Sequence, residues 1–220
     1  MKTINLSEHP SMLNIYLWEI RNVAIQGDPL RFRRNIERIG EIMAVEVSKT
    51  LDYAVDNVQT PLGIASIDLP QDRIVLGTIL RAGLPFHQGF LNVYDRAESA
   101  FLSAYRRMGR NRDGKQDLEI VAEYLAAPSL EGKTLILVDP MLATGMSMEV
   151  AYKALLSHGQ PKKTHLCCTI GTKQAIAYLE ANMPDDVTLW CGAIDEELND
   201  KKYIVPGLGD AGDLCYGTKL

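Results

Sequence analysis

The stretch LILVDPMLATGMS, residues 135–147, indicates the fold class and a place where a ligand could bind. It begins with apolar residues typical of a buried strand, and these end at Asp139 and Pro140. A loop of small, hydroxylated and glycine residues follows, and a helix-like pattern begins at Ser147. The backbone N–H groups at a helix start lack partners and favour an anion. The sequence therefore predicts a strand–loop–helix unit that can hold a phosphate group.

The residue types in this loop suit the two ends of a sugar phosphate. Gly145 lets the backbone approach a phosphate closely, and the hydroxyls of Thr144 and Ser147 can add hydrogen bonds. Asp139, at the end of the strand, is an acceptor better suited to sugar hydroxyls than to phosphate. On the local pattern alone, an equally good interpretation is that Thr144 or Ser147 only caps the helix and Asp139 only faces water.

Strands and helices alternate along the rest of the chain. Strands are predicted over residues 73–80, 99–105, 118–126, 134–138, 164–170 and 187–194. Helices are predicted over residues 32–51, 83–94, 147–159 and 172–183. Because apolar strands alternate with helices, we expect an α/β fold with a mostly parallel sheet covered on both faces. Ligands of such sheets bind at the carboxyl ends of the strands.

Length, composition and charge indicate a single-domain protein and argue against a membrane protein or a general nucleic-acid binder. A chain of 220 residues suits one domain over 1–220, with 1–30 as an N-terminal extension and 195–220 as a tail. We expect a cytoplasmic protein without membrane contact, because no apolar run is long enough to span a bilayer and residues 1–16 lack a secretory layout. The four cysteines have neither zinc-site nor redox-pair spacing. A net charge of -5 argues against a general nucleic-acid binder.

Two nucleotide-binding motifs occur in the wrong context. GRNRDGKQ (109–116) nearly matches the phosphate-binding P-loop, but Gln116 replaces the final hydroxyl residue. This segment is predicted to be a hairpin with Asp113-Gly114 at its turn. GLGDAG (207–212) fits the dinucleotide fingerprint, yet too little chain follows it for the required helix and acidic residue. The glycines and proline of 203–212 instead predict a loop without helix or strand.

Residues 139–147 resemble the phosphoribosyl-pyrophosphate (PRPP) loop of type I phosphoribosyltransferases. The Asp-Pro form of the loop is similar to that of the uracil phosphoribosyltransferase branch. Three further segments resemble that branch: ILRAGLPFHQGFL (79–91), the pair Tyr105-Arg106, and YIVPGLGDAGDLCYGTK (203–219). Met146 stands where the family loop commonly has a second glycine, and its side chain could crowd the phosphate.

The resemblance implies a fold and a reaction. The fold would be the type I phosphoribosyltransferase fold, with a mostly parallel central sheet flanked by helices, a mobile β-hairpin and an N-terminal helical extension. The reaction would convert uracil and PRPP into uridine monophosphate and pyrophosphate, in pyrimidine salvage. Two alternatives stay open: a transferase of the same superfamily acting on another base, and a non-catalytic PRPP sensor controlling pyrimidine genes.

The resemblance also assigns the site residues. PRPP would be bound by Arg81, Arg106, Asp139, Pro140, Met141, Leu142, Ala143, Thr144, Gly145, Met146, Ser147 and Asp210. Uracil would be contacted by Ile204, Gly209, Asp210 and Ala211. The catalytic candidates are Arg106 and Asp210, although without the resemblance Arg106 would be interpreted as a solvated hairpin charge. A strained peptide is implied at 80–82.

The resemblance further implies cofactors and partners. Mg²⁺ would arrive with PRPP, and no dedicated protein metal cage is expected because Pro140 replaces a carboxylate. GTP is a candidate effector, and the protein would be a homodimer or homotetramer. Outside the resemblance, we predict that His87 is packed or at the surface. We expect the acidic residues 195–197 to form a solvated loop, with a supporting role for Asp195 as the minor alternative.

Overall fold

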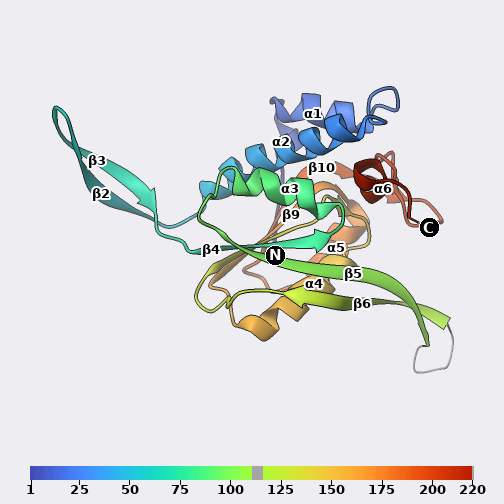
Figure 1. Ribbon diagram of the computed structural model, residues 1–220. Coiled ribbons are helices and arrows are strands. Elements are labelled where there is room, and N and C mark those ends of the chain that lie inside the picture. Colours follow the sequence, from blue (N-terminus) through green and yellow to red (C-terminus); the bar gives the residue numbers. More distant parts are fainter. Residues whose placement is uncertain (111–115, 220) are drawn as a thin grey trace.

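A mostly parallel sheet forms the centre of the molecule (Figure 1). The computed structural model describes residues 1–110 and 116–219, and the side chains of these residues outside 104–110 and 116–123. The strand order is β1-β10-β9-β7-β4-β5-β6, and β8 pairs with β9. The strands are β1 (Lys2–Asn5), β4 (Ile74–Leu80), β5 (Glu98–Arg110), β6 (Gln116–Ala126), β7 (Thr134–Val138), β8 (Met141–Leu142), β9 (Lys163–Thr172) and β10 (Thr188–Asp195). All neighbouring strands run parallel except β5 and β6.

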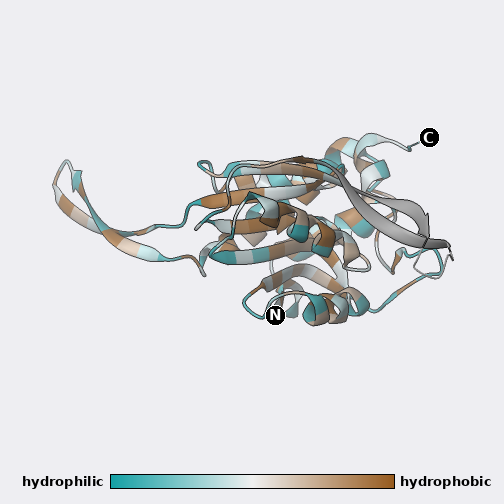
Figure 2. Cartoon of the chain, turned by 90° about the horizontal axis from the view of Figure 1, so that it is seen from below, coloured by the Kyte–Doolittle hydropathy of each residue, from teal (hydrophilic) through white to brown (hydrophobic). Residues whose placement is uncertain are grey.

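Helices cover both faces of this sheet, as the alternating pattern predicted (Figure 1). The helices are α1 (Leu13–Arg21), α2 (Pro29–Ser48), α3 (Gly83–Leu91), α4 (Met146–Leu155), α5 (Lys173–Asn182) and α6 (Ala211–Tyr216). Side chains of β7 alternate between two cores. Ile136 and Val138 pack with α1, α2 and α3, whereas Leu135 and Leu137 pack with α4 and α5. A strand buried on both faces is therefore apolar throughout, and Figure 2 shows these apolar strands inside the molecule.

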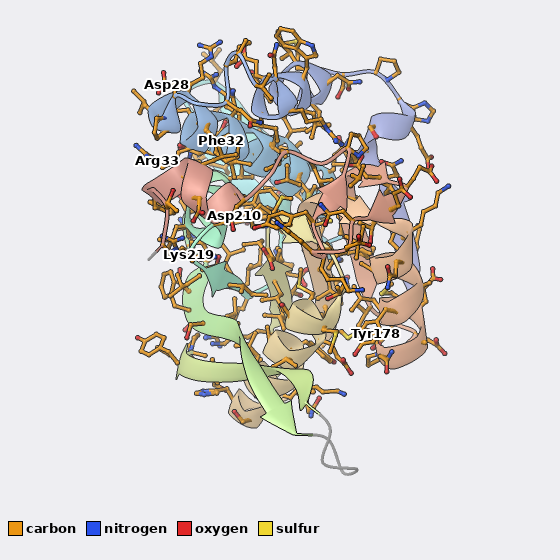
Figure 3. The ribbon with its side chains drawn as sticks, turned by 90° about the vertical axis from the view of Figure 1, so that its right-hand side faces the viewer. Asp28, Phe32, Arg33, Tyr178, Asp210 and Lys219 are labelled. Atoms are coloured by element: carbon orange, nitrogen blue, oxygen red, sulfur yellow. The ribbon has the colours of Figure 1, made fainter. Side chains whose placement is uncertain are left out.

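Helix α2 shows how local sequence sets an element boundary. Its apolar positions recur at spacings of three and four, and Phe32, Ile36 and Ile39 are fully buried. The helix begins at Pro29, earlier than predicted, because the Asp28 side chain accepts hydrogen bonds from two backbone N–H groups of the first turn. Figure 3 shows Asp28 at this helix start and Phe32 one turn further along.

The sequence analysis did not predict strand β1 or the hairpin of β2 and β3. Strand β1 of the N-terminal extension pairs with β10 at the sheet edge. Strands β2 (Tyr53–Thr60) and β3 (Gly63–Pro70) form an antiparallel hairpin that projects away from the sheet (Figure 1). Most of its residues are exposed, so the strands carry no alternation of buried and polar positions by which to recognise them.

The prediction for residues 203–212 was partly wrong. β12 (Ile204–Val205) pairs with β11 (Glu197–Leu198), and α6 begins at Ala211. The helix forms because the Asp210 side chain accepts a hydrogen bond from the Asp213 N–H at 3.0 Å. The predicted hairpin is present as antiparallel β5 and β6, while its turn at 113–114 lies outside the described residues. Within the described chain, no helix is both long and apolar enough to cross a bilayer.

Candidate active site

A cavity of about 550 Å³ lies where the carboxyl ends of β4 and β7 meet the C-terminal tail. This is the sheet edge at which a parallel α/β fold is expected to bind its ligand. Its lining comes from five parts of the chain: Ile79, Leu80, Arg81 and Ala82; Ser103; Asp139, Met141, Ala143 and Ser147; Lys202, Tyr203, Ile204, Gly209, Asp210, Ala211 and Gly212; and Lys219. Site residues predicted from three separate segments, 79–91, 139–147 and 203–219, therefore come together around one space.

A smaller hollow of about 50 Å³ is formed by the loop between β7 and α4. Its lining is Asp139, Met141, Leu142, Ala143, Thr144, Gly145, Ser147 and Met148. Helix α4 starts beside this hollow, and no side chain in the described part of the chain caps it. The hydroxyls of Thr144 and Ser147 are therefore not used as caps, against the simpler of the two interpretations. The first-turn N–H groups favour an anion at this place.

Gly145 is required by its backbone and by its neighbours. Its φ is +82°, in the left-handed region that favours glycine. A Cβ atom would lie 3.0 Å from Cδ1 of Tyr178 and 3.1 Å from the carbonyl oxygen of Ala175. Tyr178, which Figure 3 shows on α5, donates a hydrogen bond to Oε2 of Glu149 on α4. Helix packing behind the loop thus adds a second reason for glycine to the predicted close approach of a ligand.

Met146 and Pro140 sit differently from the residues that line the hollow. Met146 is the first residue of α4 and half-buried, and it is not among the described residues that line either space. The backbone carbonyl of Pro140 accepts hydrogen bonds from the N–H groups of Thr169 and Ile170. Pro140 therefore anchors the loop to β9 through its backbone.

Asp139 lies at the boundary of the two spaces and has an altered acidity. Loss of water around its carboxyl group raises the pKa of Asp139 to about 7. A hydrogen bond from the Met141 N–H, at 3.3 Å, acts in the opposite direction and only partly offsets this rise. The carboxyl group thus titrates near neutral pH, which fits a functional acceptor better than a solvated strand end.

Arg81 follows β4 directly and points toward the C-terminal helix. The peptide bond between Leu80 and Arg81 is cis. Nη2 of Arg81 donates to Oδ1 of Asp213 at 3.0 Å, and Nη1 donates to the carbonyl oxygen of Gly217 at 3.4 Å. The arginine side chain is 41% exposed, so these contacts are open to exchange with an anionic ligand.

The predicted uracil-binding residues all line the larger cavity. Ile204 and Ala211 are buried, whereas Gly209 and Asp210 are more open. Oδ2 of Asp210 lies 3.5 Å from the Nζ atom of Lys219, and Figure 3 shows the two side chains close together. The sequence analysis did not assign Lys219 a role, although it lies in the tail segment 203–219 that carried the resemblance.

The hairpin arginines cannot be placed around the cavity. Arg106 belongs to β5, and its backbone pairs with Ile120 of β6. Its side chain, like those of Arg107 and Arg110, lies outside the described side chains, and Arg112 lies outside the described residues. The role of Arg106 in pyrophosphate binding and catalysis therefore stays a prediction.

His87 and Asp195 are buried and have protein partners. His87 is packed as predicted, with Nε2 3.0 Å from the Ser99 hydroxyl, and burial lowers the pKa of His87 to about 4. The prediction of a solvated loop was wrong for Asp195, which is buried and paired with Arg21 at 2.8 Å. Sequence patterns miss this pair because its members lie at opposite ends of the chain.

Comparison with known proteins places the chain in a family. It matches the model of the uracil phosphoribosyltransferase family over residues 7–218. A uracil phosphoribosyltransferase of Porphyromonas gingivalis is 54% identical over 220 residues, covering 100% of both chains. One of Methanothermobacter thermautotrophicus is 39% identical over 192 residues, covering 86% of this chain and 85% of that one. The solved structure of the AQ2163 protein from Aquifex aeolicus has a TM-score of 0.84 at 33% identity, over 99% of each chain. The chain therefore belongs to the uracil phosphoribosyltransferase family and has the type I phosphoribosyltransferase fold.

Proposed function

We propose that the protein transfers the phosphoribosyl group of PRPP to uracil, forming uridine monophosphate and pyrophosphate in pyrimidine salvage. One observation carries this proposal: the small hollow and the larger cavity share Asp139, Met141, Ala143 and Ser147 in their linings. A small space at a helix start thus borders a larger space that is lined by the glycine-rich tail. A sugar phosphate and a planar base can bind side by side in such a site.

The phosphate end of PRPP would occupy the hollow. The N–H groups of the first turn of α4 and the hydroxyls of Thr144 and Ser147 are the donors there. The carboxylate of Asp139 would accept hydrogen bonds from the ribose hydroxyls, which lie next along the substrate. The pyrophosphate would be held by Arg81 and by Arg106, and Arg81 would exchange Asp213 for the ligand.

The base would bind against the tail. Uracil presents alternating donors and acceptors along its edge, and residues 209–211, whose backbone offers both kinds of group, line the same cavity. Cytosine presents a donor where uracil presents an acceptor, so it would leave buried polar groups without partners. The geometry therefore supports a preference for uracil over cytosine.

In the reaction, N1 of uracil forms a bond to C1 of the ribose while the bond from C1 to the pyrophosphate oxygen breaks. N1 releases its proton to water, and positive charge develops on the sugar ring. The carboxylate of Asp210, which lines the cavity, would stabilise that charge. The protein contributes mainly by positioning the two substrates and stabilising charge.

Mg²⁺ would enter as a complex with PRPP. The residues present suit this arrangement, because Asp139 and Asp210 supply carboxylate oxygens to the cavity. Among the described residues, no three His, Cys, Asp or Glu side chains are grouped to hold a metal ion. When bound, Mg²⁺ would neutralise charge on the departing pyrophosphate. We also propose that the protein acts in the cytoplasm as a homodimer or homotetramer, with GTP as a candidate effector.

A turnover assay tests the proposed function. Purified protein, Mg²⁺ and PRPP are mixed with labelled uracil, and with cytosine, hypoxanthine or orotate in parallel reactions. We expect uridine monophosphate from uracil and no nucleotide from the other bases. Product from hypoxanthine or orotate instead would assign another base. PRPP binding by calorimetry without turnover of any base would replace the enzyme by a PRPP-binding regulator.

A further inference from the structure

We propose that the N-terminal extension is part of the base site. Arg21 and Asp195 would act as positioning residues that hold the turn Gly207-Leu208 on the side away from the cavity. The residues that follow this turn, 209–211, would then present their backbone to uracil. This inference rests on the proposed placement of uracil against the tail.

The pair Arg21–Asp195 joins the two ends of the chain. Arg21 is the last residue of α1, and Asp195 is the last residue of β10. Nη1 and Nη2 of the arginine donate to Oδ2 and Oδ1 of the aspartate, both at 2.8 Å. The side chains are only 23% and 7% exposed. A two-pronged pair with so little water around it has a defined geometry, unlike a typical surface ion pair.

Both members of this pair also bind the turn. Oδ2 of Asp195 accepts a hydrogen bond from the Gly207 N–H at 2.9 Å. Nη1 of Arg21 donates to the Gly207 carbonyl oxygen at 3.2 Å. The Nε2 atom of Gln26, also in the extension, donates to the Leu208 carbonyl oxygen at 3.2 Å. Three backbone groups of the turn are therefore fixed by side chains that lie outside it.

The backbone conformation of the turn is restricted at Gly207. Gly207 has a φ of +57°, and a Cβ atom there would lie 2.0 Å from the carbonyl oxygen of Ile204. Gly207 and Leu208 are buried and are absent from the cavity lining, whereas Ile204 and 209–212 line the cavity. One side of the tail is thus bound to the extension, and the other side is left for a ligand. The backbone groups that would bind uracil are consequently held in place before it binds.

The chain offers a matched control in a second ion pair that also involves α1. Arg31 of α2 pairs with Glu19 of α1 through Nε at 3.0 Å and Nη2 at 2.6 Å. This pair also fixes α1, but among the described residues the only other hydrogen bond to its two side chains comes from Asn35. Loss of the Arg31 pair should loosen α1 without releasing the tail.

The experiment measures steady-state kinetics and thermal unfolding of the full chain for R21Q, D195N, Q26A and R31Q. We expect R21Q and D195N to raise the KM for uracil at least ~10-fold, because charge-assisted hydrogen bonds hold the turn. Q26A, which removes a single neutral hydrogen bond to the turn, should raise it ~2–5-fold. The KM for PRPP should stay within about twofold in all of them, and R31Q should leave both KM values near those of the parent.

Discrimination between bases supplies a readout that lost stability alone would not change. If the turn is displaced, the ratio of uracil to cytosine turnover should fall in R21Q and D195N and stay constant in R31Q. Equal changes in both KM values, or the same effect in R31Q, would overturn the inference and leave the pair a purely structural one. Should R21Q fail to fold, D195N and Q26A decide the result.

The variant I204A separates this inference from the proposed uracil placement. Ile204 lines the cavity, and within the described part of the chain it forms no hydrogen bond with Arg21. A raised KM for uracil in I204A with no change in R21Q and D195N would keep the placement and reject the positioning role. An unchanged KM for uracil in I204A would reject the placement itself.

Discussion

The loop that would bind phosphate (139–147) is held mainly by its neighbouring strands and helices, whereas the tail that would bind the base (203–219) is held mainly by side chains from distant parts of the chain. The loop is one continuous strand–loop–helix unit, and its shape follows from neighbouring strands and the packing of α5 behind it. The tail has only a two-residue strand and a short helix of its own, and it depends on Arg21, Gln26, Arg33 and Asp195 from distant parts of the chain. Changes in the loop should therefore act locally, whereas the tail should respond to changes far from the cavity.

The largest effect is expected where the loop cannot adapt. G145A places a side chain at a φ of +82° and 3.0 Å from Cδ1 of Tyr178, so the backbone is strained and a neighbouring group must shift. We expect kcat/KM for PRPP to fall ~100-fold and the free energy of unfolding to fall by ~1–3 kcal/mol. The matched control is G132A, where φ is +67° but no atom lies within 4 Å of the added Cβ. G132A should lose stability and keep its activity, and equal activity losses in both variants would contradict the special role of the loop.

Arg81 and Arg33 provide the next test, because both bind the C-terminal helix and only Arg81 lines the cavity. Figure 3 shows Arg33 on α2 beside that helix, and its Nη1 donates to the Cys215 carbonyl oxygen at 2.6 Å. We expect R81A to raise the KM for PRPP ~10–100-fold through loss of a charge-assisted contact. R33A should change the KM for PRPP less than about threefold. Similar values for the two variants would mean that Arg81 acts only by holding the helix.

The pH dependence of stability tests Asp139, the residue at which the loop begins. The pKa of Asp139 is raised to about 7 in the folded protein, so between about pH 4 and 7 the carboxyl group is ionised in the unfolded chain and protonated in the folded protein. The free energy of unfolding therefore falls as the pH rises through this window. D139N removes this charge and should be more stable than the parent at pH 8 by ~1–4 kcal/mol. At pH 5 the difference should be about half as large or less, and urea unfolding at both pH values measures it. A constant difference at the two pH values would contradict the raised pKa.

Substrate binding should depend on the same carboxyl group in the opposite direction. If the ionised Asp139 accepts hydrogen bonds from ribose, PRPP affinity should rise ~3–10-fold between pH 6 and 8 in the parent. Part of any such rise comes from ionisation of PRPP itself. D139N lacks the titrating carboxyl group, so the rise that it shows is the contribution of PRPP alone. Calorimetric profiles of equal slope in the two proteins would rule out the proposed contact with ribose.

The smallest effect is expected at Lys219. Its side chain is 63% exposed and its Nζ atom is 3.5 Å from Asp210, which is the geometry of a weak surface ion pair. K219M should change kcat/KM by less than about threefold at physiological salt. A much larger loss would show that Lys219 binds the substrate directly. The tail would then contribute a side chain of its own to the site.

Sequence reasoning succeeded where the physics is local. The apolar runs of β4, β7, β9 and β10 and the spacing in α2 identified the sheet and its helices, because burial imposes a period on neighbouring residues. It missed the hairpin of β2 and β3, whose exposed strands carry no such period. It also missed α6, since a helix of one or two turns has too few positions to show one.

The sequence by itself determined the α/β fold class and the strand–loop–helix unit at 135–147. Both depend on residues close along the chain, whose order is the pattern that is read. Only the tertiary structure decided that Arg21 and Asp195 hold the turn at Gly207, and that Tyr178 packs within 3.0 Å of the place a Cβ atom would take at Gly145. These contacts join residues far apart along the chain, and a linear pattern carries no record of which side chains folding brings together.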